Sequence, residues 1–166
     1  MGTFSIKPAK TDVALDKIAA LANEIWHEYF VPIIGLEQVN YMIANFQSYP
    51  SLKQQVKEGF EYYQIFSNDT FAGYTGIRPE EDALFLSKLY IHKDFRGQHL
   101  CSDTIRFLQD LCRQRGLKKI YLTCNRQNTL TLDVYKHLGF KIVRSEKNDI
   151  GNGFFMDDHI LEINII

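Results

Sequence analysis

Three apolar segments rich in aromatic residues follow one another in the middle of the chain, separated only by short polar turns. They cover residues 60–67, 71–77 and 83–91. Segments of this length and composition are typical of β-strands. Because turns this short can join only antiparallel neighbours, the sequence predicts an antiparallel three-strand meander. A sheet is therefore the constraint that every other element must satisfy.

The pattern changes after residue 95, where helical and strand periodicities alternate. Residues 100–114 form a predicted helix that ends at Gly116, with apolar positions at Cys101, Ile105, Leu108, Leu111 and Cys112. A strand at 118–125 follows, and then a helix over 128–137 with Leu130, Val134 and Leu138 at helical spacing. Gly139 ends that helix, and two more strands are predicted at 140–145 and 154–164.

The segment before the meander predicts one strand and two helical regions. The strand covers residues 4–9, and a helix follows with Thr11 or Asp12 as its N-cap. Pro32 and Gly35 interrupt it, and a second helical region covers 36–58 with a break near Pro50. The first helix has its apolar positions at Leu15, Ile18, Ala22, Ile25 and Tyr29, and the second at Val39, Met42, Ile43 and Phe46.

This order of elements predicts an α/β (α+β) fold, a mixed and mostly antiparallel seven-stranded sheet with helices on both faces. With 166 residues, the chain is long enough for one domain that spans 1–166.

Charge and cysteine content exclude several classes of partner. The net charge is -1, from 19 basic and 20 acidic side chains, which argues against nucleic acid or a membrane surface as partner. The apolar run at 30–36 is far shorter than the ~20 residues that span a bilayer. Three cysteines and the lack of a signal-peptide pattern predict reduced thiols in the cytoplasm. The five histidines have no metal-binding spacing, so we expect no metal site.

The junction at residues 95–103, FRGQHLCSD, carries the first functional signal. A strand that enters a helix through a glycine-containing turn aims unpaired N–H groups and the positive helix end at one point, which suits an anion. A merely tight connection, with Arg96 as a solvated charge, is the alternative. Asn128, Tyr135, Gly139 and Phe140 follow at fixed distances.

These two segments together resemble the signature of the GNAT family of N-acetyltransferases. The family's Q/RxxGxG/A segment corresponds to Arg96, Gly97, Gln98, His99, Leu100 and Cys101, and its later N…Y..LGF segment to Asn128, Thr131, Tyr135, Leu138, Gly139 and Phe140. His99 and Cys101 stand where the family has glycines. A left-handed His99 would be strained by about 1–2 kcal/mol, about one factor of ten in affinity.

The resemblance implies acetyl-CoA as co-substrate, bound where the fourth and fifth strands splay apart. Its predicted contacts are Leu89, Tyr90, Ile91, Arg96, Gly97, Gln98, His99, Leu100, Cys101, Ser102, Asn128 and Tyr135. The backbone N–H of Leu89 would stabilise the oxyanion, and Tyr135 would protonate the leaving thiolate.

Alternatives to four of these roles remain open. Tyr135 could be a core aromatic residue and Asn128 an N-cap. His99 could contact a phosphate or only solvent. Cys101 could be a reactive thiol of lowered pKa or a buried inert one.

The same resemblance implies that the acceptor binds between the first two helices and the last strands. The candidate residues are Trp26, His27, Glu28, Tyr29, Asp157 and Asp158, with His159 beside them. Acidic groups there would suit a cationic amine, although Asp157 and Asp158 could be solvated strand residues.

The expected function is transfer of an acetyl group from acetyl-CoA to a primary amine, such as a polyamine or a peptide or protein amine, by direct attack in a ternary complex. A non-catalytic acyl-CoA sensor or partner-binding module is the alternative, and the resemblance allows a homodimer.

Overall fold

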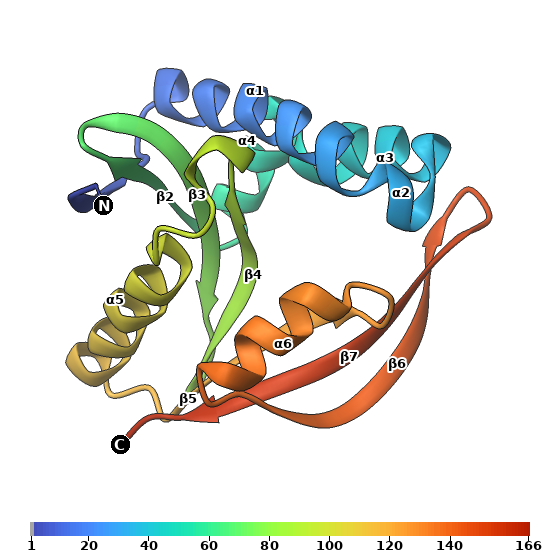
Figure 1. The fold of residues 1–166 in the computed structure, drawn as a ribbon. Helices are drawn as coiled ribbons and strands as arrows, with labels where there is room; N and C mark the ends of the chain where they lie inside the picture. Colours follow the sequence, from blue (N-terminus) through green and yellow to red (C-terminus); the bar gives the residue numbers. More distant parts are fainter. Residues whose placement is uncertain (1) are drawn as a thin grey trace. The chain divides into compact units, whose positions relative to one another are not determined.

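The computed structural model describes residues 2–166, which contain one seven-stranded sheet in the order β1-β2-β3-β4-β5-β7-β6 (Figure 1). The strands are β1 Phe4–Pro8, β2 Glu61–Ser67, β3 Thr70–Pro79, β4 Ala83–Ile91, β5 Lys119–Asn125, β6 Lys141–Gly151 and β7 Phe154–Asn164. The helices are α1 Asp12–Tyr29, α2 Val31–Ile34, α3 Leu36–Met42, the π-helix η1 Ile43–Gln47, α4 Tyr49–Lys57, the 3-10 helix η2 Lys93–Phe95, α5 Leu100–Arg115 and α6 Thr129–His137. The predicted fold class is confirmed.

Contacts between residues divide the chain into two units. The first unit runs up to Arg78 and includes Lys88–Phe107, and the second contains Pro79–Ser87 and Leu108–Ile166. A single domain over 1–166 stays a prediction.

The first unit contains the meander that the sequence predicts. β2 pairs with β3 in antiparallel register from Glu61↔Ile77 to Ser67↔Thr70, and β1 adds to the other edge of β2. The second half of β4 is held by β3, since Thr75 Oγ1 donates to the carbonyl of Lys88 at 2.7 Å. The predicted bounds of these three strands are correct within two residues.

The helices of this unit follow the sequence prediction less closely. Thr11 is the N-cap of α1, because its side chain accepts from the N–H of Ala14 at 3.1 Å. The region 36–58 breaks at Ser48, and Pro50 lies in the first turn of α4, where a missing N–H is tolerated. The predicted break near Pro50 is therefore a helix start.

The π-helix that precedes this start was not predicted, and it changes which side chain enters the core. Gln47 at its end is only 3% exposed, and its Oε1 accepts from the hydroxyl of Tyr74 at 2.8 Å. π-Segments are rare and are frequent at functional sites.

The second unit contains the parallel strand pair. The first half of β4 pairs with β5 in parallel register from Ala83↔Lys119 to Leu86↔Leu122. On its other side β5 pairs with β7 in antiparallel register. This pairing continues to Asn125↔Asp158, three residues beyond Leu122, the last β5 residue paired with β4. Within this unit the parallel pairing lies at the beginning of β4, and the divergence of the two strands stays a prediction.

Two predictions in this unit need correction. β6 continues past residue 145 to Gly151, because it pairs with β7 up to Gly151↔Phe154 in the long ribbon seen in Figure 1. The helix α6 is confirmed, but its predicted apolar spacing marks the exposed side. Leu130 and Val134 are 69% and 41% exposed, whereas Leu132 and Tyr135 are buried.

Lys88, in the second half of β4, is buried in the first unit. Its Nζ donates to Gln55 Oε1 and to the hydroxyl of Tyr62, each at 2.8 Å, and it lies over the Phe60 and Tyr62 rings. Burial lowers the pKa of Lys88 to about 7. The same burial raises the pKa of Tyr62. Lys88 therefore changes its charge near neutral pH.

We expect Lys88→Met to raise the free energy of unfolding at pH 6, because methionine carries no charge that burial would disfavour. Below pH 7 folded Lys88 is charged and disfavoured by burial. Between pH 7 and 10.5 the unfolded chain holds a proton that the folded protein has released, so wild-type stability rises with pH.

The advantage of Lys88→Met over wild type should therefore shrink between pH 6 and pH 9, as measured by urea unfolding at both values. Lys57→Met, an exposed lysine on α4, is the matched control. A Lys88→Met protein less stable than wild type at pH 6 would contradict the expectation.

Candidate active site

The turn between β4 and α5 brings the amides of a helix start together. Gly97 and His99 both have left-handed backbones, with φ of 77° and 65°, and α5 begins immediately after them. The first helical hydrogen bond runs from the N–H of Asp103 to the carbonyl of His99 at 2.9 Å. The N–H groups of Leu100, Cys101 and Ser102 precede it and have no intrahelical acceptor. This geometry suits an anion.

His99 is in the left-handed conformation, which is the condition under which strain is expected. A non-glycine residue at such a φ is strained by about 1–2 kcal/mol. The imidazole of His99 is exposed, and a contact between it and a phosphate stays a prediction.

Three side chains around this turn are held within the first unit. Gln98 Oε1 accepts from the buried hydroxyl of Ser67 at 3.2 Å, and the hydroxyl of Ser102 donates to the carbonyl of His99 at 2.9 Å. Burial raises the pKa of the Cys101 thiol to about 11. A reactive Cys101 of lowered pKa is therefore wrong, and the inert thiol is the better description.

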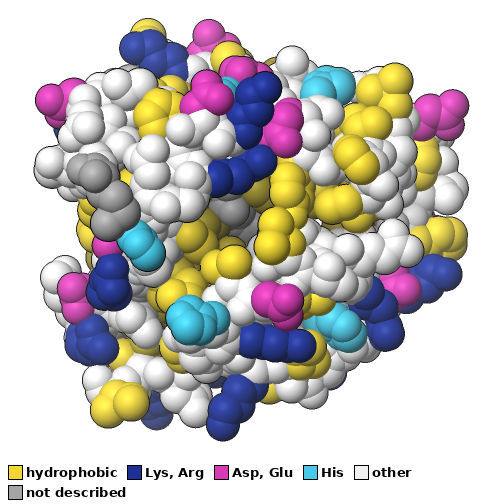
Figure 2. Space-filling view, in the orientation of Figure 1, with side chains coloured by type: hydrophobic (Ala, Val, Ile, Leu, Met, Phe, Trp, Pro, Cys, Tyr) yellow, Lys and Arg dark blue, Asp and Glu magenta, His cyan; other side chains and the backbone are white. Residues whose placement is uncertain are grey.

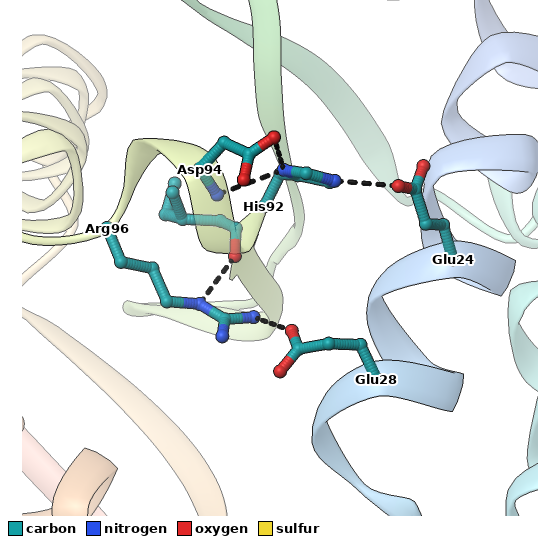
Figure 3. A network of polar contacts seen from close by, with 6 residues as sticks. Glu24, Glu28, His92, Asp94 and Arg96 are labelled. Atoms are coloured by element: carbon teal, nitrogen blue, oxygen red, sulfur yellow. Dashed lines mark hydrogen bonds and ion pairs between the residues drawn. The ribbon is translucent and has the colours of Figure 1, made fainter.

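Arg96 binds to α1. Its guanidinium forms an ion pair with Glu28 Oε1 at 2.7 Å, and its Nε donates to the carbonyl of Ile91 at 2.9 Å (Figure 3). The guanidinium also lies over the ring of Tyr29, at 5.0 Å from the centroid. The side chain is thus engaged on three sides, and its predicted contact with the co-substrate remains untested.

His92 makes a second connection to α1, one helical turn away from the first. Its Nδ1 accepts from the N–H of Asp94 at 3.1 Å, so the ring proton is on Nε2, which donates to Glu24 Oε1 at 2.7 Å. Figure 3 shows Glu24 and Glu28 on successive turns of α1, pointing at His92 and Arg96. Sequence reasoning missed Glu24 and His92, although Glu24 and Glu28 have i,i+4 spacing.

The three β4 residues predicted to bind the co-substrate divide between two faces. Leu89 and Ile91 pack against the buried cluster of Ile65, Ala72 and Leu100. The Tyr90 ring lies on the other face, against Trp26 at 5.5 Å and Phe30 at 5.8 Å. The predicted catalytic role of Leu89 therefore rests on its backbone N–H alone.

The acceptor candidates on α1 are not all equally available. Trp26 is 3% exposed and stacks on Phe30 at 4.2 Å. Both ring nitrogens of His27 are occupied, by the carbonyl of Asn23 at 2.7 Å and by Asn40 Oδ1 at 2.9 Å. Glu28 and Tyr29 come together around Arg96, so these two are the candidates that the fold assembles.

In the second unit, the residues of the later motif lie at the start and within α6. Asn128 is buried, and its N–H donates to the carbonyl of Asn125 at 3.0 Å. Asn128 occupies the N-cap position of α6, and its carbonyl accepts from the N–H of Leu132 at 3.0 Å, but its side chain makes no capping hydrogen bond. Tyr135 is 6% exposed and packs edge-on against Phe140 at 5.3 Å. Its burial fits the core alternative, and its role as a proton donor stays a prediction.

The two acidic candidates of β7 differ strongly. Asp157 forms an ion pair with Arg126 at 2.7 Å and is half-exposed. Asp158 is 6% exposed, and burial, with Asp157 and Glu146 adding to it, raises the pKa of its carboxyl to about 6. The solvated alternative is therefore wrong for Asp158.

Charge and composition of the surface agree with the near-neutral sequence. On the face drawn in Figure 2, acidic and basic side chains are interspersed. Among residues 2–166 no group of three or more His, Cys, Asp or Glu side chains could hold a metal ion. None of the helices in this part of the chain is long and apolar enough to cross a membrane.

We expect His99→Gly to strengthen CoA binding by up to about tenfold, because glycine removes the strain of a left-handed residue. Calorimetric titration with CoA measures the effect. Asn152→Gly is the matched control, since Asn152 is also left-handed, at φ 55°, but lies in the β6–β7 turn. A clear loss of affinity in His99→Gly would instead mean that the imidazole helps to hold the phosphates.

Known structures share the fold of this chain. The PaiA N-acetyltransferase from Thermoplasma acidophilum, solved with coenzyme A, superposes with a TM-score of 0.79 at 18% identity, over 98% of this chain and 99% of that one. The ribosomal-protein-S18-alanine N-acetyltransferase from Escherichia coli superposes with a TM-score of 0.71 at 18% identity, over 98% of this chain and 94% of that one.

Sequence comparisons identify the family. A curated relative, GCN5-related N-acetyltransferase 6, chloroplastic, from Arabidopsis thaliana is 27% identical over 63 residues, which are 38% of this chain and only 22% of that protein. The family model described as Acetyltransferase (GNAT) family matches residues 18–140. The chain therefore belongs to the GNAT family of acetyltransferases.

Proposed function

We propose that the protein transfers an acetyl group from acetyl-CoA to a primary amine, by direct attack of the amine in a ternary complex. The observation that carries this proposal is the left-handed pair Gly97 and His99 immediately before α5. Together they leave three amides of the first helical turn aimed at one point, which suits the pyrophosphate of coenzyme A. Family membership supports the same reaction.

Acetyl transfer from a thioester needs a donor for the developing oxyanion and a proton for the leaving thiolate. In our proposal the N–H of Leu89 serves the first need and the hydroxyl of Tyr135 the second. An unperturbed phenol has a pKa near 10 and is protonated at neutral pH. A buried tyrosine with a fixed ring is also well suited to hold its hydroxyl in one position.

The acceptor side would be formed by α1. Glu28 has one carboxylate oxygen on Arg96, and the aromatic rings of Tyr29, Phe30 and Tyr90 lie nearby. A carboxylate beside aromatic faces is suited to an ammonium group with an alkyl stem. A small cationic amine, such as a polyamine, is therefore our first candidate for the acceptor, and a peptide amine the second.

The test is an assay of free thiol release from acetyl-CoA with a panel of amines. The panel contains polyamines, amino acids and peptides with free N-termini, because one similar structure is named a ribosomal-protein-S18-alanine N-acetyltransferase. We expect at least one amine to accelerate release and to gain an acetyl group by mass spectrometry. If acetyl-CoA raises the Tm but no amine is acetylated, the protein is a binding module without turnover.

We expect Tyr135→Phe to lower kcat by about 10²–10⁴-fold, the usual contribution of a positioned acid. Its affinity for acetyl-CoA should change little, because only one hydroxyl is removed. Steady-state kinetics and calorimetry measure the two quantities.

Tyr121→Phe is the control for this substitution. Tyr121 also lies in the second unit, its hydroxyl donates to Glu80 at 2.7 Å, and it is not part of the predicted motif. Its kcat should equal that of wild type. An unchanged kcat in Tyr135→Phe would mean that Tyr135 is a structural core residue and not the proton donor.

A further inference from the structure

Asp158 is a buried carboxylate whose hydrogen bonding is incomplete. It is 6% exposed, and its Oδ1 has no hydrogen-bond partner among residues 2–166. A buried polar atom without a partner usually costs about 1–3 kcal/mol. A native fold retains such a group where it has a use, so Asp158 needs an explanation beyond strand formation.

Two arginines on the segments adjacent to Asp158 are paired with other carboxylates. Arg126 Nε binds Asp157 at 2.7 Å, and Arg144 Nε binds Glu146 at 2.9 Å. The remaining negative charges of Asp157 and Glu146 add to the effect of burial on Asp158. The carboxyl is thus surrounded by groups that favour its protonated form, with a pKa of about 6.

The elements adjacent to Asp158 contribute the following charged and titratable groups. β6 contributes Glu146 with its partner Arg144, β7 contributes Asp157 and His159, and β5 contributes Cys124, while the turn after β5 contributes Arg126. His159 Nδ1 contacts the hydroxyl of Ser145 at 2.6 Å. The Cys124 thiol remains protonated near neutral pH, because burial and Asp158 raise its pKa to about 12.

The position of Asp158 on β7 connects it to the later motif of the chain. In register, Asp158 lies opposite Asn125 at the end of β5. The carbonyl of Asn125 accepts from the N–H of Asn128, and its side chain accepts from the N–H of Gln127 at 2.8 Å. Asp158 is therefore adjacent to the turn that leads into α6, the helix that carries Tyr135.

We propose that Asp158 is the general base of the reaction, which removes a proton from the acceptor ammonium group directly or through one water molecule. This inference rests on the proposed function. A carboxylate that accepts a proton near pH 6 is well matched to an amine that must be neutral to attack.

The proton balance is complete with residues already named. Asp158 takes one proton from the ammonium group and later releases it to solvent. The amine nitrogen forms a bond to the acetyl carbon, and the carbon–sulfur bond breaks. Tyr135 gives its proton to the leaving thiolate and regains one from the nitrogen, which leaves an amide, coenzyme A as a thiol, and one free proton.

Asp158→Asn tests the proposal, because the amide keeps the shape of the side chain but cannot accept the proton. We expect kcat/KM to fall by about 10²–10⁴-fold. The wild-type pH profile of kcat/KM should have an acidic limb near pH 6, and the variant should lack it. The variant should also be more stable than wild type above pH 6, because the folded protein no longer buries a charge there.

Glu146→Gln tests the position of the acidic limb, which would not change if Asp158 had only a structural role. Removal of the negative charge of Glu146 should lower the pKa of Asp158, so the acidic limb should move to lower pH. Asp149→Asn is the control, since Asp149 only accepts from the N–H of Gly151 in the hairpin, and asparagine can still accept there. The kcat/KM of Asp149→Asn and the acidic limb of its pH profile should match those of wild type.

The possible results are distinct. A wild-type protein that acetylates no amine overturns the proposed function before any variant is compared. If wild type is active and Asp158→Asn keeps its rate and its acidic limb, only the assignment of the base fails. If Asp158→Asn does not fold, the pH profile of kcat/KM of Glu146→Gln becomes the test. An acidic limb at the same pH as in wild type would then refute the role of Asp158.

Discussion

The division of β4 between two partners is the constraint on which the rest of the structure depends. Its first four residues form parallel pairs with β5, and its later residues bond to β3. Backbone groups of a strand need partners along its whole length, whether in a sheet, in water or in a ligand. The family resemblance implies that β4 and β5 then separate, and the backbone groups freed in that way would be available to an extended substrate arm.

The turn after β4 depends on the same arrangement. Leu89 and Ile91 direct apolar side chains into the cluster that includes Leu100, the first residue of α5. This packing fixes where α5 begins, and the left-handed Gly97 and His99 close the short distance between strand and helix. The anion-binding geometry is thus a consequence of core packing in the first unit together with two unusual backbone angles.

Sequence reasoning succeeded where the signal is local. The meander, α5 and β7 were predicted within two residues, because alternation and helical periodicity are set by neighbours along the chain. It failed where the partner is distant. β6 extends to Gly151 only because β7 pairs with it, and α6 buries Leu132 and Tyr135 rather than the face of Leu130.

Buried charges were hidden for the same reason. Lys88 interrupts an apolar strand and would ordinarily point to water, and nothing in the sequence indicates that Gln55 and Tyr62 receive it. Asp158 follows another aspartate in a strand, and only the register shows which of the two is buried. Candidate residues in this site could thus be named from motifs, but their protonation required the fold.

The ion pair of Arg96 with Glu28 and the hydrogen bond of His92 to Glu24, which connect the β4–α5 turn to α1, have a consequence for protein engineering. If α1 forms the acceptor side as proposed, a library that varies this helix to accept a new amine would include position 28 and its neighbour one turn earlier, position 24. Each change would also release His92 or Arg96. Under the proposed function, selection for a new acceptor would therefore also disturb the turn proposed to bind the acyl donor, so the two specificities would change together.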